Sequence, residues 1–87
     1  MKRIYNYKGY EVSVELEPVC EAIGGVTFLP PRGFVAVVRI RMVGAVRPTV
    51  APIRLTADSQ HPFATEAEAL MAGYSAGQRV VDDALVQ

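Results

Sequence analysis

Residues 34–43 form the pattern that most limits how this chain can fold. Even positions there hold Phe34, Ala36, Val38, Ile40 and Met42, and odd positions hold Val35, Val37, Arg39, Arg41 and Val43. Successive side chains of a β-strand point to opposite faces, so one face of this segment is wholly apolar. We expect that face to point into the core and the face that carries the arginines to point toward water.

Residues 10–17 alternate in the same way and predict a second strand, which we expect to end at Pro18. Residues 4–7 could form a short strand joined to it through Lys8 and Gly9, because glycine accepts the positive φ of a tight turn. Ile53–Leu55 resumes the strand pattern further along the chain.

Glycine and proline predict two loops between these strands. Residues 20–33 contain Gly24-Gly25 and Pro30-Pro31, although residues 26–29 could pair briefly at an edge. Residues 44–52 are apolar but contain Pro48 and Pro52, so they predict a long hairpin loop or an irregular edge strand.

The C-terminal quarter predicts a helix over residues 66–85. Thr65 and Glu68 have the spacing of a capping box, in which the Thr65 hydroxyl accepts a hydrogen bond from the Glu68 backbone N–H. An apolar stripe that packs on a sheet recurs at intervals of three and four, at Ala67, Leu70, Tyr74, Gly77, Val81 and Ala84 or Leu85. A second row of small residues, Ala69, Gly73 and Gly77, would let the helix approach a sheet closely.

The chain has 87 residues, of which 51% are hydrophobic, so it is expected to fold as a single domain over residues 1–87. The predicted fold is α+β. An antiparallel sheet of three to four strands, over about residues 4–57, packs one face on the C-terminal helix in the order ββ(β)βα.

Charge is balanced overall, with nine Lys and Arg against nine Asp and Glu, but its distribution is uneven. Residues 22–57 hold five arginines and no acid, whereas residues 58–87 hold five acids and one base. In an antiparallel sheet, Glu11, Glu15 and Glu17 would share the outer face with Arg39, Arg41 and Arg54, where opposite charges pair favourably. These arginines therefore either pair with the glutamates or form a binding surface.

The first hypothesis for function is a non-enzymatic protein-interaction module that binds another protein or a second copy of itself. Valines share the outward face with arginines and the loop at 44–52 is apolar, which makes this surface more apolar than a small monomer needs. The candidate interaction residues are Val35, Val37, Arg39, Arg41, Arg47 and Arg54.

The alternative hypothesis is a nucleic-acid-binding (RNA or DNA) module that uses the arginine-rich face. Against it, the alternation places Tyr10 and Phe34 on the opposite face, away from any stacking platform beside the arginines.

An enzyme is not expected, and neither is a cofactor or a metal. Cys20 and His61 are the only thiol and the only imidazole, and no catalytic signature surrounds either. His61 and Asp58 offer two ligands where zinc sites use three or four. A single cysteine fits a reducing compartment, so a cytoplasmic location is expected. No segment is apolar for long enough to span a membrane, and the first seven residues lack the apolar stretch of a signal peptide.

The order of elements and the helix start Phe63-Ala64-Thr65-Glu66-Ala67-Glu68-Ala69-Leu70 resemble small bacterial domains built as a β-meander followed by a C-terminal helix. They are more distantly similar to HicB-type antitoxins, whose partial double-stranded-RNA-binding-like fold enters its helix through a Thr-x-x-Glu-Ala-type segment. The residues 24–27 match the Gly-Cys-x-Thr turn of those proteins only loosely, and we expect no separate DNA-binding domain. The resemblance implies an antitoxin-like regulator as a form of the alternative hypothesis.

Overall fold

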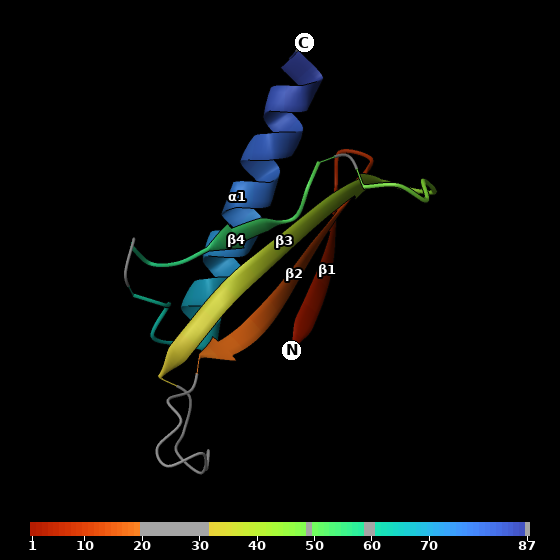
Figure 1. The fold of residues 1–87 in the computed structure, drawn as a ribbon. Helices are drawn as coiled ribbons and strands as arrows, with labels where there is room; N and C mark the ends of the chain where they lie inside the picture. Colours follow the sequence, from red (N-terminus) through yellow and green to blue (C-terminus); the bar gives the residue numbers. More distant parts are fainter. Residues whose placement is uncertain (20–31, 49, 59–60, 87) are drawn as a thin grey trace.

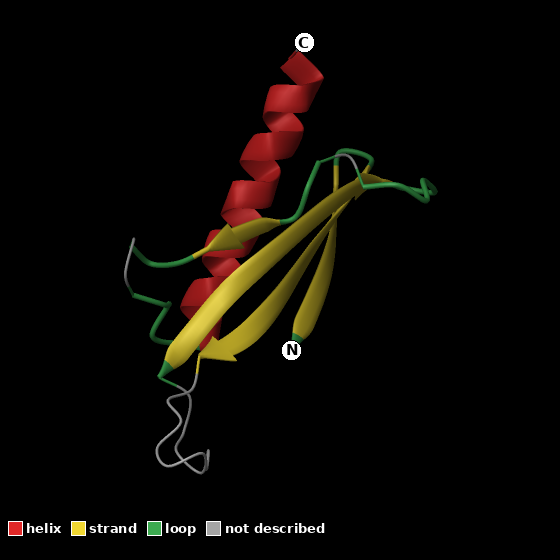
Figure 2. Ribbon diagram, in the orientation of Figure 1, coloured by secondary structure: helices red, strands yellow, loops and turns green. Residues whose placement is uncertain are grey.

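The sheet and the helix follow the predicted order. The structure is a computed structural model that describes residues 1–19, 32–48, 50–58 and 61–86. Its elements are β1 (Lys2–Tyr7), β2 (Tyr10–Val19), β3 (Gly33–Met42), β4 (Ile53–Leu55) and α1 (Glu66–Val86). The strands form one antiparallel sheet in the order β1-β2-β3-β4, and α1 covers one face of it (Figure 1, Figure 2). The predicted α+β fold is confirmed.

The alternation in β2 and β3 separates a core from an outer face, as the sequence predicts. Ile40 is fully buried beneath α1, and Arg39 is exposed on the other face. The core consists of Val12, Val14, Leu16, Ala36, Val38, Ile40, Ala69 and Val81. Met42, which was also expected in the core, is 55% exposed, because β3 and α1 diverge toward their C-terminal ends (Figure 1).

The row of small residues on α1 faces the middle of the sheet. Gly73 packs on Val14 and Gly77 on Val12, so closely that a Cβ added to Gly73 would lie 2.5 Å from a methyl carbon of Val14. Leu70 and Tyr74 are half-buried beside this row. Ala67, Ala84 and Leu85, predicted to belong to the packed stripe, are exposed, and that prediction is wrong for them because the small row takes the central position.

Local interactions define the turn between β1 and β2 and the start of α1. Lys8 and Gly9 have positive φ values of 49° and 83°, which is the geometry of a two-residue hairpin turn between β1 and β2. The Glu68 N–H donates to the Thr65 hydroxyl over 3.2 Å, which confirms the predicted cap at the start of α1.

Pro18 does not end β2, which corrects the sequence prediction. β2 continues through Pro18, which pairs with Phe34, to Val19. The Leu16 N–H donates to the Met1 carbonyl, so even-numbered residues of β2 direct their backbone N–H and C=O groups toward β1. The pairing of β1 with β2 stops short of Pro18, because Lys2 at the start of β1 lies opposite Glu15. The missing N–H of Pro18 therefore breaks no ladder hydrogen bond.

The two predicted loops differ in how far the structure describes them. Residues 20–31, with the possible edge pairing at 26–29, lie outside the described residues. The described part of the 44–52 loop contains no strand and projects from the end of β3 (Figure 1).

Candidate functional site

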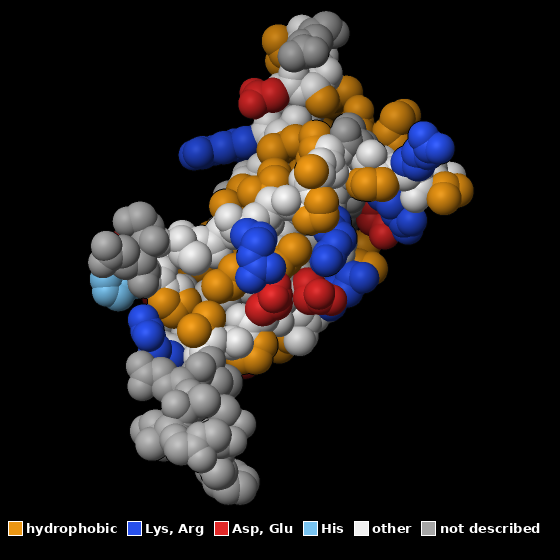
Figure 3. All heavy atoms as spheres, in the orientation of Figure 1, with side chains coloured by type: hydrophobic (Ala, Val, Ile, Leu, Met, Phe, Trp, Pro, Cys, Tyr) orange, Lys and Arg blue, Asp and Glu red, His pale blue; other side chains and the backbone are white. Residues whose placement is uncertain are grey.

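The outer face of the sheet, which α1 leaves uncovered, carries most of the charged side chains of the strands. In the observed register the residues that face outward are Lys2, Ile4 and Asn6 on β1, Glu11, Ser13, Glu15 and Glu17 on β2, Val35, Val37, Arg39 and Arg41 on β3, and Arg54 on β4. Figure 3 shows acidic and basic side chains in contact across the sheet, with hydrophobic side chains around them.

The glutamates and arginines pair as the sequence predicts. Arg41 Nη2 lies 3.2 Å from both carboxylate oxygens of Glu11, the residue directly opposite on β2. Arg39 reaches Glu15 over a longer 3.7 Å. The Arg54 guanidinium on β4 bonds Glu17 on β2, so this ion pair crosses over β3. All three arginine side chains are about half exposed, so each pair contributes little to stability in water.

These ion pairs bury part of the surface that was predicted to be available for contacts. Val37 lies between Glu15 and Arg54 in the register and is only 3% exposed. Val35, opposite Glu17, is half-buried. The aliphatic stems of long charged side chains cover neighbouring apolar groups while their charged ends stay in water. The expectation that Val37 is exposed is therefore wrong.

The other end of the outer face contains a hollow of about 310 Å³, called here the outer hollow. It is lined by Lys2, Ile4, Glu11, Ser13, Arg39, Ile40, Arg41, Val46 and Pro48. The lining combines three cations and one carboxylate with the apolar groups of Ile4, Val46 and Pro48. Lys2 has no ion-pair partner among the described residues. A volume near 300 Å³ is at the lower end of small-molecule sites.

Ser13 is the unusual residue of the outer hollow. It lies on β2 between Ile4 of β1 and Arg39 of β3, and it is 8% exposed. Its hydroxyl is buried with no hydrogen-bond partner in the structure. An unpaired buried hydroxyl is costly, and each one in a folded protein needs an explanation.

The predicted interaction residues divide between the two ends of this face. Arg39 and Arg41 line the outer hollow, whereas Arg54 lies outside it in its ion pair with Glu17. Arg47 is exposed in the loop after β3 and does not line the hollow. Sequence reasoning missed Lys2, Ile4 and Ser13. The signal for Ser13 was its place among the glutamates of β2, which the alternation puts opposite an arginine.

β1 forms a free edge of the sheet. Within the described residues it pairs only with β2. Because Met1 bonds Leu16, the odd-numbered residues of β1 direct their backbone groups toward β2. The backbone groups of Lys2, Ile4 and Asn6 therefore point outward from the edge, and the Ile4 side chain beside them is 55% exposed.

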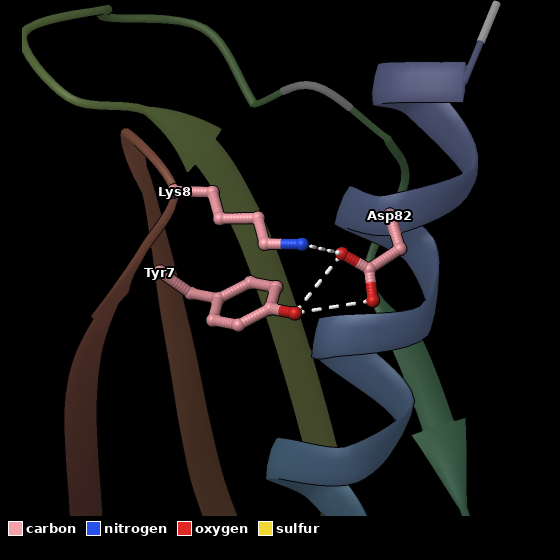
Figure 4. A network of polar contacts seen from close by, with 3 residues as sticks. All are labelled: Tyr7, Lys8 and Asp82. Carbon is pink, nitrogen blue, oxygen red and sulfur yellow. Dashed lines mark hydrogen bonds and ion pairs between the residues drawn. The ribbon is translucent and has the colours of Figure 1, made fainter.

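A polar cluster on the helix side ties the first hairpin to the end of α1. Lys8 Nζ lies 2.8 Å from Asp82, and the Tyr7 hydroxyl donates to both oxygens of the same carboxylate over 2.9 and 3.1 Å (Figure 4). The ring of Tyr74 stacks on Tyr5 and meets the edge of Tyr7. The hydrogen bonds from Lys8 and Tyr7 lower the pKa of Asp82, and the bond to Asp82 raises the pKa of Lys8.

We expect Asp82→Asn to destabilise the protein in a pH-dependent way. The folded pKa of Asp82 is lowered, so its stabilising effect is complete above the ordinary pKa and is lost as pH falls through the lowered one. Because the pKa of Lys8 is raised, the stability that Lys8 contributes is lost only as pH rises through that raised pKa. The difference in thermal midpoint between wild type and Asp82→Asn should be constant from about pH 5 to 9 and shrink below about pH 4.

Asp83→Asn is the matched control, because it removes the adjacent, exposed carboxylate. It should leave the midpoint nearly unchanged at every pH. The same pH profile for both variants would show that the cluster does not stabilise the fold.

The residues considered for catalysis and metal binding do not form a site in the described part of the chain. His61 Nδ1 lies 2.8 Å from Asp58, and the imidazole is 67% exposed. Cys20 lies outside the described residues. Across residues 1–19, 32–48, 50–58 and 61–86, no three His, Cys, Asp or Glu side chains gather as metal ligands would. In those same ranges no helix has the length and apolarity needed to cross a membrane.

Comparison with protein-family models, curated proteins and solved structures finds no match to this chain. The resemblance to HicB-type antitoxins therefore stays a prediction.

Proposed function

We propose that this protein is a non-enzymatic, cytoplasmic protein-interaction module that pairs with a second copy of itself along β1. The observation that carries the proposal is the free edge of β1, where outward backbone groups lie beside the exposed Ile4. Strand addition at such an edge uses main-chain hydrogen bonds for affinity and alternate side chains for specificity.

The register that pairs the whole edge is symmetric about Ile4. An antiparallel, two-fold arrangement would place Ile4 opposite Ile4 of the partner subunit, and Lys2 opposite Asn6 of the partner subunit. On the helix face, Arg3 would lie opposite Tyr5 of the partner subunit. No two like charges are opposed in this register, and the two four-stranded sheets would join into one sheet.

The other surfaces of the sheet support self-association less well. Val37 is buried under ion pairs, so the valine and arginine end of the outer face has little apolar area to offer. β4 is an edge of only three residues, Ile53–Leu55, and gives a partner a short ladder. β1 is twice as long, at six residues.

Nucleic-acid binding receives less support from the same surface. The outer face carries four cations, Lys2, Arg39, Arg41 and Arg54, against three glutamates, and each of those arginines has a glutamate partner. Tyr5, Tyr7, Phe34 and Tyr74 pack around the core on the helix side. A basic groove with stacking aromatics, which single-stranded nucleic acid needs, is thus missing from the described residues of this face.

Sedimentation equilibrium over a range of protein concentrations tests the proposal. We expect a weak dimer, because the contact is small, and Ile4→Lys should weaken it about tenfold or more by placing two like charges at the symmetry axis. Asn6→Pro should have the same effect, since it removes a backbone donor from the edge without touching the ladder to β2.

Leu85→Lys is the matched control. Leu85 is 50% exposed on α1, close to the exposure of Ile4, and the change adds the same charge away from β1. It should leave the dimer intact. A wild-type monomer at all concentrations would overturn the proposal, as would a dimer that responds to Leu85→Lys and not to Ile4→Lys. Binding of RNA or DNA by a protein that does not self-associate would favour the alternative hypothesis instead.

A further inference from the structure

The geometry of the outer hollow points to a binding site for a small monocarboxylate with a short aliphatic stem. Three features of the hollow carry this inference: an unpartnered buried hydroxyl, cations that outnumber acids, and an apolar wall. It goes beyond self-association, because Ser13 on β2 and Arg39 on β3 lie away from the β1 edge, although Lys2 and Ile4 of β1 also line the hollow.

The Ser13 hydroxyl supplies a donor that the protein leaves unused. It is more than nine-tenths buried, lines the hollow and bonds to no other group. A carboxylate oxygen accepts strongly from a hydroxyl, and such charge-assisted bonds are stronger than neutral ones. A bound carboxylate would therefore supply the hydrogen bond that this buried hydroxyl lacks.

The charged lining has room for one additional negative charge. Glu11 is held by Arg41, which leaves Lys2 and Arg39 to meet an anion. Arg39 is opposite Ser13, is half exposed, and its ion pair with Glu15 spans 3.7 Å. An exposed pair of that length is weak, so Arg39 can turn from Glu15 toward a ligand and uncover the Ser13 hydroxyl. The nearby glutamates disfavour a dianion such as phosphate.

The apolar part of the lining determines the rest of the ligand. Ile4 on β1 and the loop residues Val46 and Pro48 provide aliphatic surface in the same hollow as the cations. Burying an aliphatic stem against these residues removes apolar surface from water and so favours binding. Acetate has only one methyl group and gains little in this way. The volume of about 310 Å³ limits this stem to a short one.

Titration of the full-length protein with hexanoate, followed by the shifts of backbone amide resonances, tests this inference. We expect saturable shifts at Ser13 and at its cross-strand neighbours Ile4 and Arg39. Acetate and inorganic phosphate should bind more weakly than hexanoate, and hexylammonium should not bind there.

Two variants and one matched control make the test specific. Arg39→Gln should weaken hexanoate binding about tenfold, the effect of losing a charge-assisted contact, and Ser13→Ala should weaken it severalfold. Arg54→Gln removes the same charge from the same face but outside the hollow, and it should bind hexanoate like wild type. Ser13→Ala should fold at least as well as wild type, because the unpaired hydroxyl is gone.

The inference fails if hexanoate causes no saturable shifts, if hexylammonium causes the same shifts, or if Arg39→Gln and Ser13→Ala bind as Arg54→Gln does. Sedimentation of the same variants separates this result from the test of self-association. Neither Ser13 nor Arg39 lies at the β1 edge, so both variants should still form the dimer.

Discussion

Gly73→Leu is expected to destabilise the protein by about 3 kcal/mol or more, although leucine is the better helix former. A Cβ at Gly73 alone would lie 2.5 Å from a methyl carbon of Val14, which is fully buried in β2. The larger side chain must therefore lift α1 off the sheet and separate the two layers of the core. Urea denaturation followed by circular dichroism measures the change. The gain in helix propensity, at most about 1 kcal/mol, is too small to offset the loss.

The matched control for this change is Ser75→Leu. Ser75 lies on the exposed side of the same helix, two residues from Gly73, so the substitution should change stability by no more than about 0.5 kcal/mol. Equal losses for the two variants would show that leucine acts through the helix itself and not through contact with the sheet.

A double-mutant cycle identifies the contact. Gly73→Ala and Val14→Ala should each destabilise the protein, the first by crowding and the second by leaving a cavity. Combined, the new alanine methyl at 73 occupies space that Val14 vacates, so the loss should be smaller than the sum by about 1 kcal/mol. Strict additivity would contradict the close packing of α1 on β2.

Ile40→Ala is expected to cost about 2–5 kcal/mol, because Ile40 of β3 is fully buried in the core. Arg41→Ala, at the next position of the same strand, should cost no more than about 1 kcal/mol, since it removes only a partly exposed ion pair. Urea denaturation of both variants measures the contrast. If Arg41→Ala were the more damaging change, the two faces of β3 would have been assigned the wrong way round.

The strands and the helix could be predicted because each side chain's burial follows from its own position in a repeating pattern. The alternation through Ile40 and Arg39 sets the two faces of β3, and Thr65 with Glu68 marks the start of α1. Even the pairing of Arg41 with Glu11 could be anticipated, because alternation places both on the outer face.

Features that depend on the register between strands could not be predicted in the same way. Pro18 is tolerated because its nitrogen faces the side of β1, and the pairing of β1 with β2 does not extend as far as Pro18. This depends on the register between β1 and β2. Val37 is buried because an ion pair from β2 to β4 passes over β3. The outer hollow likewise brings Lys2 and Pro48, which are far apart in the sequence, into one lining with Ser13.

Self-association along β1 is tested most directly by hydrogen exchange of single backbone amides at several protein concentrations. The amides of Ile4 and Asn6 point outward from the edge, whereas those of Tyr5 and Tyr7 point toward β2. Exchange at Ile4 and Asn6 should slow as concentration rises, while exchange at Tyr5 and Tyr7 changes much less. Exchange at Ile4 and Asn6 that is independent of concentration, or slowing confined to α1, would contradict pairing through this strand.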